Sequence, residues 1–188
     1  VWVVAAGEVH AARQVLKVHP YRLNTIHSYE GGPCAYVEEG RVRWVAAPSA
    51  ACSAWAQADL LDLLSCDELP WVELLQSGAA QGARAVNALV GVGVQGLVVA
   101  GTGNATVHHE LQQALLRARE QGVMVWCTTR CLEGQTVGQG EPVAGDAGEA
   151  GLMDEIKAQL CQAADPLMLD CVLLPPSKAR VAMMLELL

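Results

Sequence analysis

The chain has no cluster of lysine or arginine, no long hydrophobic run and no C-x-x-C pair. With 12 basic against 20 acidic residues its formal net charge is -8, which argues against a protein that binds nucleic acid or an anionic membrane. No apolar run approaches the roughly 20 residues that cross a bilayer. The seven cysteines are odd in number and irregularly spaced, which favours buried thiols over a metal site and is compatible with a reducing cytoplasm.

What the chain does contain is a strand–turn–helix–strand pattern between Gly96 and Arg130. The apolar run Leu97–Ala100 ends in a glycine-rich turn, helical apolar spacing follows over Thr106–Gln121, and a second β-rich run occupies Val123–Cys127. This pattern predicts a βαβ unit with parallel strands. Because ligands bind beyond the carboxyl ends of the strands in such sheets, the turn Gly101–Thr106 is the candidate binding site.

Three interpretations of that turn remain open. A dinucleotide site is disfavoured, because the third glycine of GxGxxG falls at Thr106 and the next strand lacks a terminal acidic residue. Backbone N–H groups at the helix start, with the side chains of Asn104 and Thr106, suit a small polar or anionic group. Alternatively, Gly101 and Gly103 allow a tight turn and Asn104 caps the helix.

The remaining pattern predicts an α/β fold: a small Rossmann-like domain with a parallel sheet flanked by helices. Hydrophobic residues make up 52% and charged residues 17%, which indicates a well-buried core. The N-terminal region predicts a strand at Val1–Ala5, a helical or looping piece around Ala12–Val18, and a hairpin. The hairpin pairs Ala35–Val37 with Val42–Val45 across Glu38-Glu39-Gly40. Two further strands are expected, at Trp71–Leu75 and Leu169–Leu173. Three further helices are expected, at Ala83–Val90, Ala147–Ala164 and Ser177–Leu188.

Several segments, in the same order, resemble those of the bacterial-type L-asparaginase family. The stretch GLVVAGTGN from Gly96 to Asn104 is similar to that family's GIVVAGTGNGN, and Thr128-Thr129-Arg130 is similar to its Ser-Ser-Arg. Four more segments carry the resemblance: GEVHAAR with Lys17 (GEVHSARDVTKTH in the family), SYEGGPCAY from Ser28 to Tyr36 (SPNYGPLGY), LPWV from Leu69 to Val72 (LPKV), and PSKAR from Pro176 to Arg180 (NPQKAR).

The family's nucleophile region is missing from this sequence. The chain has no Thr-x-Gly-Gly-Thr, no Thr-Asp pair, and no lysine beside such a pair. A hydroxyl is a weak nucleophile without an adjacent base, so we expect no catalytic residue here and an inert chain when it is alone. The resemblance, together with a start that lacks Met, predicts the C-terminal part of a longer polypeptide.

The resemblance also implies a domain organisation and a set of site residues. Residues 1–48 would be the tail of a larger doubly wound α/β domain, 49–68 an interdomain linker, and 69–188 the small C-terminal α/β domain. In the family this domain helps to hold the substrate of a neighbouring subunit. The positions that match are Asn104 for the first asparagine of GNGN, Thr106 for the second, and Glu141 for the acidic loop residue, with Glu133 as an alternative.

The implied function of the intact protein is hydrolysis of asparagine, or of glutamine, to the acid and ammonia. This segment would supply oligomer contacts, in a dimer or tetramer, and part of the substrate grip. The expected location is the cytoplasm, with the periplasm as an alternative, and no cofactor or metal is expected. The competing hypothesis is a non-catalytic amino-acid-sensing or regulatory module that uses the Gly101–Thr106 turn as its binding end.

Overall fold

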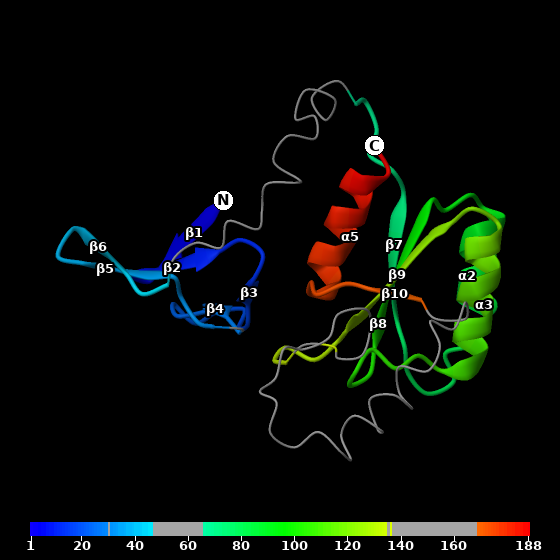
Figure 1. Ribbon diagram of the computed structural model, residues 1–188, viewed down its shortest axis with the longest axis horizontal. Helices are drawn as coiled ribbons and strands as arrows, with labels where there is room; N and C mark the ends of the chain where they lie inside the picture. Colours follow the sequence, from blue (N-terminus) through cyan, green and yellow to red (C-terminus); the bar gives the residue numbers. More distant parts are fainter. Residues whose placement is uncertain (30, 47–65, 135, 137–168) are drawn as a thin grey trace, which may run out of the picture. The chain divides into compact units, whose positions relative to one another are not determined.

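The computed structural model describes residues 1–29, 31–46, 66–134, 136 and 169–188 (Figure 1). These residues fall into two compact units. The first comprises Val1–Leu69, Leu132–Gly134 and Leu188, and the second comprises Pro70–Cys131 and Gln135–Leu187. Within the described ranges, no helix combines the length and the apolar character needed to cross a bilayer.

The second unit is built on a four-stranded parallel sheet in the order β10-β9-β8-β7. The four expected strands are confirmed as β7 (Val72–Gln76), β8 (Gly96–Gly101), β9 (Met124–Thr129) and β10 (Asp170–Cys171). Three expected helices are also confirmed, as α2 (Arg84–Gly91), α3 (His109–Glu120) and α5 (Pro176–Glu186). The helix expected over Ala147–Ala164 lies outside the described residues.

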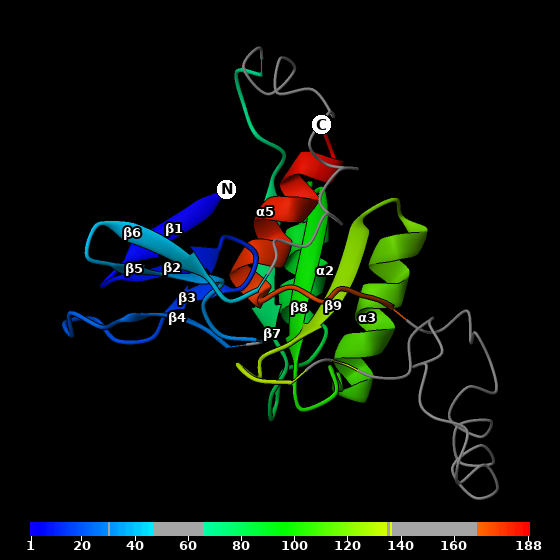
Figure 2. The same ribbon diagram turned by 60° about the vertical axis from the view of Figure 1, so that its left-hand side comes forward.

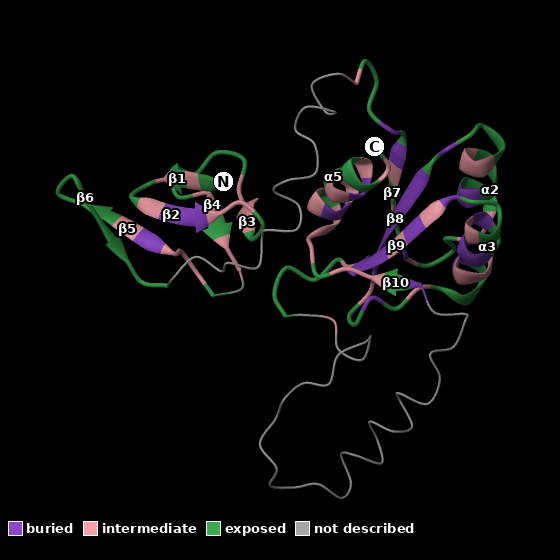
Figure 3. Cartoon of the chain, turned by 45° about the horizontal axis from the view of Figure 1, so that its top comes forward, coloured by how far each residue is buried: buried purple, intermediate pink, exposed green. Residues whose placement is uncertain are grey.

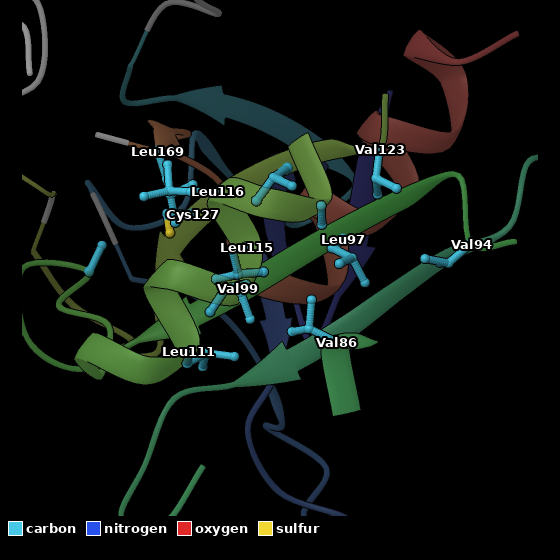
Figure 4. Packing of buried hydrophobic residues seen from close by; sticks show 14 residues of the cluster. Val86, Val94, Leu97, Val99, Leu111, Leu115, Leu116, Val123, Cys127 and Leu169 are labelled. Atoms are coloured by element: carbon cyan, nitrogen blue, oxygen red, sulfur yellow. The ribbon is translucent and has the colours of Figure 1, made fainter. Parts of the chain in front are cut away.

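Helices cover both faces of this sheet, with α5 on one face and α2 and α3 on the other (Figures 1 and 2). All six residues of β8 are therefore buried, as expected for a central parallel strand. Leu97 and Val99 pack into the cluster beneath α2 and α3 (Figure 4), whereas Val98 packs with Met183 of α5. The predicted α/β class is correct, and the continuous apolar run Leu97–Ala100 lies in β8, one of the two central strands of the sheet.

Two residues of the PSKAR segment attach α5 to the sheet. Ala179 is fully buried in the cluster with Val72 and Val98, and the Arg180 guanidinium donates from Nε to the Val72 carbonyl oxygen at 2.7 Å. Pro176 occupies the first turn of the helix, where its missing N–H costs nothing. The segment thus has a structural role at the start of α5.

The start of α3 differs from the prediction. The helix begins at His109 rather than at Thr106, and its N-cap residue is His108, so the interpretation of Asn104 as a helix cap was wrong. The physical reason lies in the turn before it. Ala105 has a left-handed backbone with φ of 58°, which a right-handed helix cannot contain, and Thr106 forms a β-bridge with Thr102.

The first unit is antiparallel. Its main sheet has the order β1-β2-β5-β6, and a separate pair of strands joins β3 to β4. These strands are β1 (Trp2–Ala5), β2 (Glu8–Ala11), β3 (Val15–Lys17), β4 (Ile26–Ser28), β5 (Ala35–Glu38) and β6 (Arg41–Trp44). The predicted hairpin is confirmed, although its turn is the two-residue Glu39-Gly40, with φ of 48° and 75°.

One expectation for the first unit was wrong, and one strand was missed. The piece around Ala12–Val18, expected to be helical or looping, contains the short strand β3, because Val15–Lys17 pairs with Ile26–Ser28 and the Val18 N–H donates to the Thr25 carbonyl oxygen at 2.8 Å. Strand β2 was not foreseen. It follows β1 through a second two-residue turn, Ala6-Gly7, in which both residues have positive φ.

Candidate functional site

Polar segments follow the carboxyl ends of three neighbouring strands of the parallel sheet. Ser77 follows β7, the turn Gly101–Thr106 starts at the last residue of β8, and β9 ends at Thr129, with Arg130 directly after it. The Ser77 N–H donates to the Ala100 carbonyl oxygen at 2.8 Å, while its buried hydroxyl oxygen accepts the His108 N–H at 3.1 Å. Ser77 therefore joins the end of β7 both to β8 and to the start of α3.

The Gly101–Thr106 turn closes on itself. The Thr102 N–H donates to the Thr106 carbonyl oxygen at 2.9 Å, and the Thr106 N–H donates back to Thr102 at 2.8 Å. The Ala105 N–H donates to Gly103 at 2.9 Å. Three of the turn's backbone donors are thus used internally, so the hypothesis that they cradle an anion has weak support.

Glycine is required at the base of this turn. A Cβ atom placed on Gly101 would lie 2.7 Å from the Cα atom of Ala105, closer than packed carbon atoms approach. At the tip, Gly103 has φ of 49° and Ala105 has φ of 58°. Ala105 stands where the similar family segment GNGN has its second glycine. Its positive φ accounts for a glycine there, because a non-glycine residue in this conformation costs about 1–2 kcal/mol.

The end of β9 holds the turn from the side. The Thr129 hydroxyl donates to the Gly103 carbonyl oxygen at 2.5 Å, and the Arg130 N–H donates to Gly101 at 3.0 Å. Its neighbour Thr128 is buried and donates its hydroxyl to the Leu174 carbonyl oxygen at 2.5 Å. Sequence reasoning had not given Thr129 this role, although its place at the end of a strand beside the turn was a usable signal.

Two of the three predicted site residues, Asn104 and Thr106, lie on the same turn. Asn104 and Thr106 are both exposed, on either side of the buried Ala105. Glu141 lies outside the described residues. The alternative Glu133 is exposed and groups with the antiparallel unit. At the turn, the candidate site is therefore an exposed amide and an exposed hydroxyl on a loop closed by its own backbone hydrogen bonds.

The geometry argues against a dinucleotide site at this edge. A pyrophosphate needs a glycine turn that leads directly into a helix N-terminus, whereas α3 starts three residues after Thr106. Across the described ranges, no group of three or more His, Cys, Asp or Glu side chains is placed to hold a metal ion. Cys127 is buried and Cys131 is exposed, and both His108 and His109 are exposed. An amide and a hydroxyl suit a small polar ligand, through hydrogen bonds to its carboxylate or amide.

Residues 71–187 match the family model described as the glutaminase/asparaginase C-terminal domain. A probable periplasmic L-asparaginase of Haemophilus influenzae is 28% identical over 141 residues, which cover 75% of this chain and 40% of that protein. A glutaminase-asparaginase of Pseudomonas fluorescens biotype A is 30% identical over 125 residues, which cover 66% of this chain and 33% of that protein. L-asparaginase 2 of Escherichia coli is 28% identical over 141 residues, which cover 75% of this chain and 40% of that protein.

The fold comparison agrees. The crystal structure of a probable cytoplasmic L-asparaginase from Campylobacter jejuni superposes with a TM-score of 0.70 at 25% identity, covering 99% of this chain and 50% of that one. The chain thus spans half or less of the length of the relatives it matches. Both the family model and the order of shared segments lead to one conclusion: this chain belongs to the glutaminase/asparaginase family, whose C-terminal domain its residues 71–187 match.

Proposed function

We propose that this chain forms the C-terminal part of an amidohydrolase that converts L-asparagine and water to L-aspartate and ammonia. L-Glutamine is the second candidate substrate, because one relative is named glutaminase-asparaginase. The observation that carries the proposal is the family match over residues 71–187. The location of the proposed enzyme is the cytoplasm, with the periplasm as the alternative, since the relatives' names carry both terms.

The proposed chemistry divides between this chain and sequence outside it. A threonine hydroxyl would attack the side-chain amide carbon, release ammonia and leave an acyl-enzyme that water hydrolyses. This chain contains no Thr-x-Gly-Gly-Thr and no Thr-Asp pair, so the nucleophile and its base would come from elsewhere. The proposed reaction uses neither metal nor cofactor.

The part assigned to this chain is substrate binding. In the proposed homo-oligomer, a dimer or tetramer, Asn104, Thr106 and Glu141 would serve the active site of a neighbouring subunit. A carboxylate such as Glu141 pairs with the substrate ammonium group, and the turn's amide and hydroxyl pair with its carboxylate. The exposed positions of Asn104 and Thr106 on one hydrogen-bonded turn support this assignment.

The test of the grip uses the product of the reading frame extended upstream of Val1, in which we expect the Thr-x-Gly-Gly-Thr. Thr106→Asn restores the amide of the family's GNGN and should raise kcat/KM for asparagine by about ten-fold, the effect of one added hydrogen bond. Thr106→Ser keeps a hydroxyl and serves as the matched control. Asn87→Ala, on the exposed side of α2, controls for loss of a surface amide and should leave kcat/KM unchanged.

A non-catalytic amino-acid-binding module is the second candidate. The observation in its favour is the departure of Ala105 and Thr106 from the family's GNGN. Such a module would bind aspartate without releasing ammonia from asparagine, in the extended product as well as in this chain. Ammonia release that is lost when the upstream threonine is replaced by alanine would exclude the module.

A further inference from the structure

Two cysteines face each other across the last two strands of the parallel sheet. Cys127 of β9 and Cys171 of β10 are register partners, and the Val172 N–H donates to the Cys127 carbonyl oxygen at 2.9 Å. Both thiols are free. Both side chains lie on the α2/α3 face of the sheet, because Cys127 belongs to that buried cluster and Cys171 packs against it. The pair has no part in the proposed hydrolysis.

The spacing of this pair suits a covalent bond. Neighbouring strands of a sheet lie about 4.8 Å apart. Disulfides join Cα atoms separated by about 4.4–6.8 Å, with both Cβ atoms pointing to the same side. Register partners on one face of a sheet meet both conditions, so the two sulfur atoms can approach without a change in the strand order.

The two thiols differ in acidity, and in a reactive pair one thiol is more acidic than the other. A hydrogen bond from Cys127 lowers the pKa of the half-buried Cys171 below its ordinary value. The same hydrogen bond raises the pKa of Cys127, and burial raises it further. Cys171 is therefore the more acidic thiol of the pair, and Cys127 is the thiol that donates a hydrogen bond to it.

We propose that Cys127 and Cys171 form a redox-active dithiol, which thiol–disulfide exchange converts to a disulfide between β9 and β10. The Cys171 thiolate attacks one sulfur of a small-molecule disulfide such as oxidised glutathione, and the other sulfur leaves as a thiolate. That thiolate takes up the proton of Cys127. The Cys127 sulfur then attacks Cys171 Sγ and expels the second glutathione thiolate, which takes up from water the proton that Cys171 released when it ionised. Two protein thiols are oxidised, and one glutathione disulfide is reduced to two thiols.

The disulfide would act on the edge of the sheet and on the strand beside the turn. Strand β10 is only two residues long, so a covalent link to β9 fixes a strand that otherwise has few backbone bonds. Cys127 directly precedes Thr128 and Thr129, whose hydroxyls bond to Leu174 and Gly103. Oxidation therefore stabilises the segment that positions the turn.

The experiment equilibrates the 188-residue chain with glutathione buffers from reducing to oxidising, quenches with an alkylating reagent, and maps the cysteines by mass spectrometry. The expected product links Cys127 to Cys171 and lacks the mass of two hydrogen atoms. Its Tm should exceed that of the reduced chain by roughly 5 °C or more, because the bond closes a long loop. Cys171→Ser should abolish the link, and this half-buried site tolerates serine even where Cys127→Ser does not fold.

Matched controls are Cys131→Ser, which removes an exposed thiol four positions after Cys127, and Cys34→Ser in the other unit. Both variants should form the link as the unaltered chain does. The proposal is overturned if Cys127 and Cys171 are both alkylated under oxidising buffer in the folded chain. It is also overturned if the mapped disulfides join either cysteine to Cys131, Cys52 or Cys161 instead.

Discussion

The parallel-sheet unit and the antiparallel unit differ in where their apolar side chains lie (Figure 3). In the parallel unit, one whole strand, β8, is buried between helices on both faces. In the described part of the antiparallel unit, the buried residues are Val9, Ala35 and the polar His10. Trp2 and Trp44 stack edge to face at 5.4 Å, yet both are exposed. Because burial of apolar surface is the main favourable term in folding, the stability of the chain is concentrated in the parallel unit.

The largest expected effect comes from deleting core volume under α2 and α3. Leu97→Ala, at a fully buried position of β8, should lower the free energy of unfolding of the parallel unit by about 2–5 kcal/mol. Val42→Ala, on the exposed strand β6, should change the free energy of unfolding of its own, antiparallel unit by less than about 0.5 kcal/mol. Urea unfolding followed by circular dichroism measures both. Equal effects of the two substitutions would contradict the comparison.

A smaller effect is expected at the base of the candidate turn. Gly101→Ala places a methyl group against the backbone of Ala105 and should cost about 1–3 kcal/mol, since the closed turn has to shift. Gly91→Ala, at the last residue of α2, meets nothing within 4 Å and should be neutral or slightly stabilising. Thermal unfolding of the two variants distinguishes them. A stable Gly101→Ala would mean that the turn is looser than described.

The smallest effect is expected in the antiparallel unit, at an exposed ion pair. The Arg43 guanidinium donates to both Glu38 carboxylate oxygens, at 2.9 and 2.8 Å. This hydrogen bonding lowers the pKa of Glu38 from its ordinary 4.5. The stabilisation is therefore present above pH 4.5 and is lost as the pH falls through the lowered pKa.

Glu38→Gln should lower the Tm slightly at pH 7 and low salt, with the difference vanishing in strong acid or at high salt. Glu39→Gln, one residue further on, is the control for removal of one negative charge. A larger loss of stability for Glu38→Gln than for Leu97→Ala would contradict the claim that the stability of the chain is concentrated in the parallel unit.

The sequence predicted the parallel unit well, because its two central strands, β8 and β9, contain continuous apolar runs and its helices α2 and α3 bury a repeating apolar stripe. Leu97–Ala100 and the stripe through Leu111 and Leu115 are examples that the structure places in the core. It predicted the antiparallel unit less well. Strands such as Val15–Lys17 are three residues long, and their pairing with Ile26–Ser28 depends on contacts that no local pattern reveals.

At the candidate site, the sequence located the turn but not its shape. The pattern Gly101-x-Gly103 before an amphipathic stretch is typical of the beginning of a helix. No feature of the sequence indicates that Ala105 adopts a positive φ. The contribution of Thr129 depends on the register of β9 beside β8, which is a property of the sheet. Whether Asn104, Thr106 and Glu141 contact a substrate stays a prediction.

The most direct test of the proposed division of labour is an ammonia assay on the 188-residue chain by itself. With L-asparagine and with L-glutamine, purified and correctly folded chain should release no more ammonia than buffer, because no threonine in it has the neighbours of a nucleophile. Sustained ammonia release that scales with the concentration of this chain, and survives repeated purification, would contradict the account.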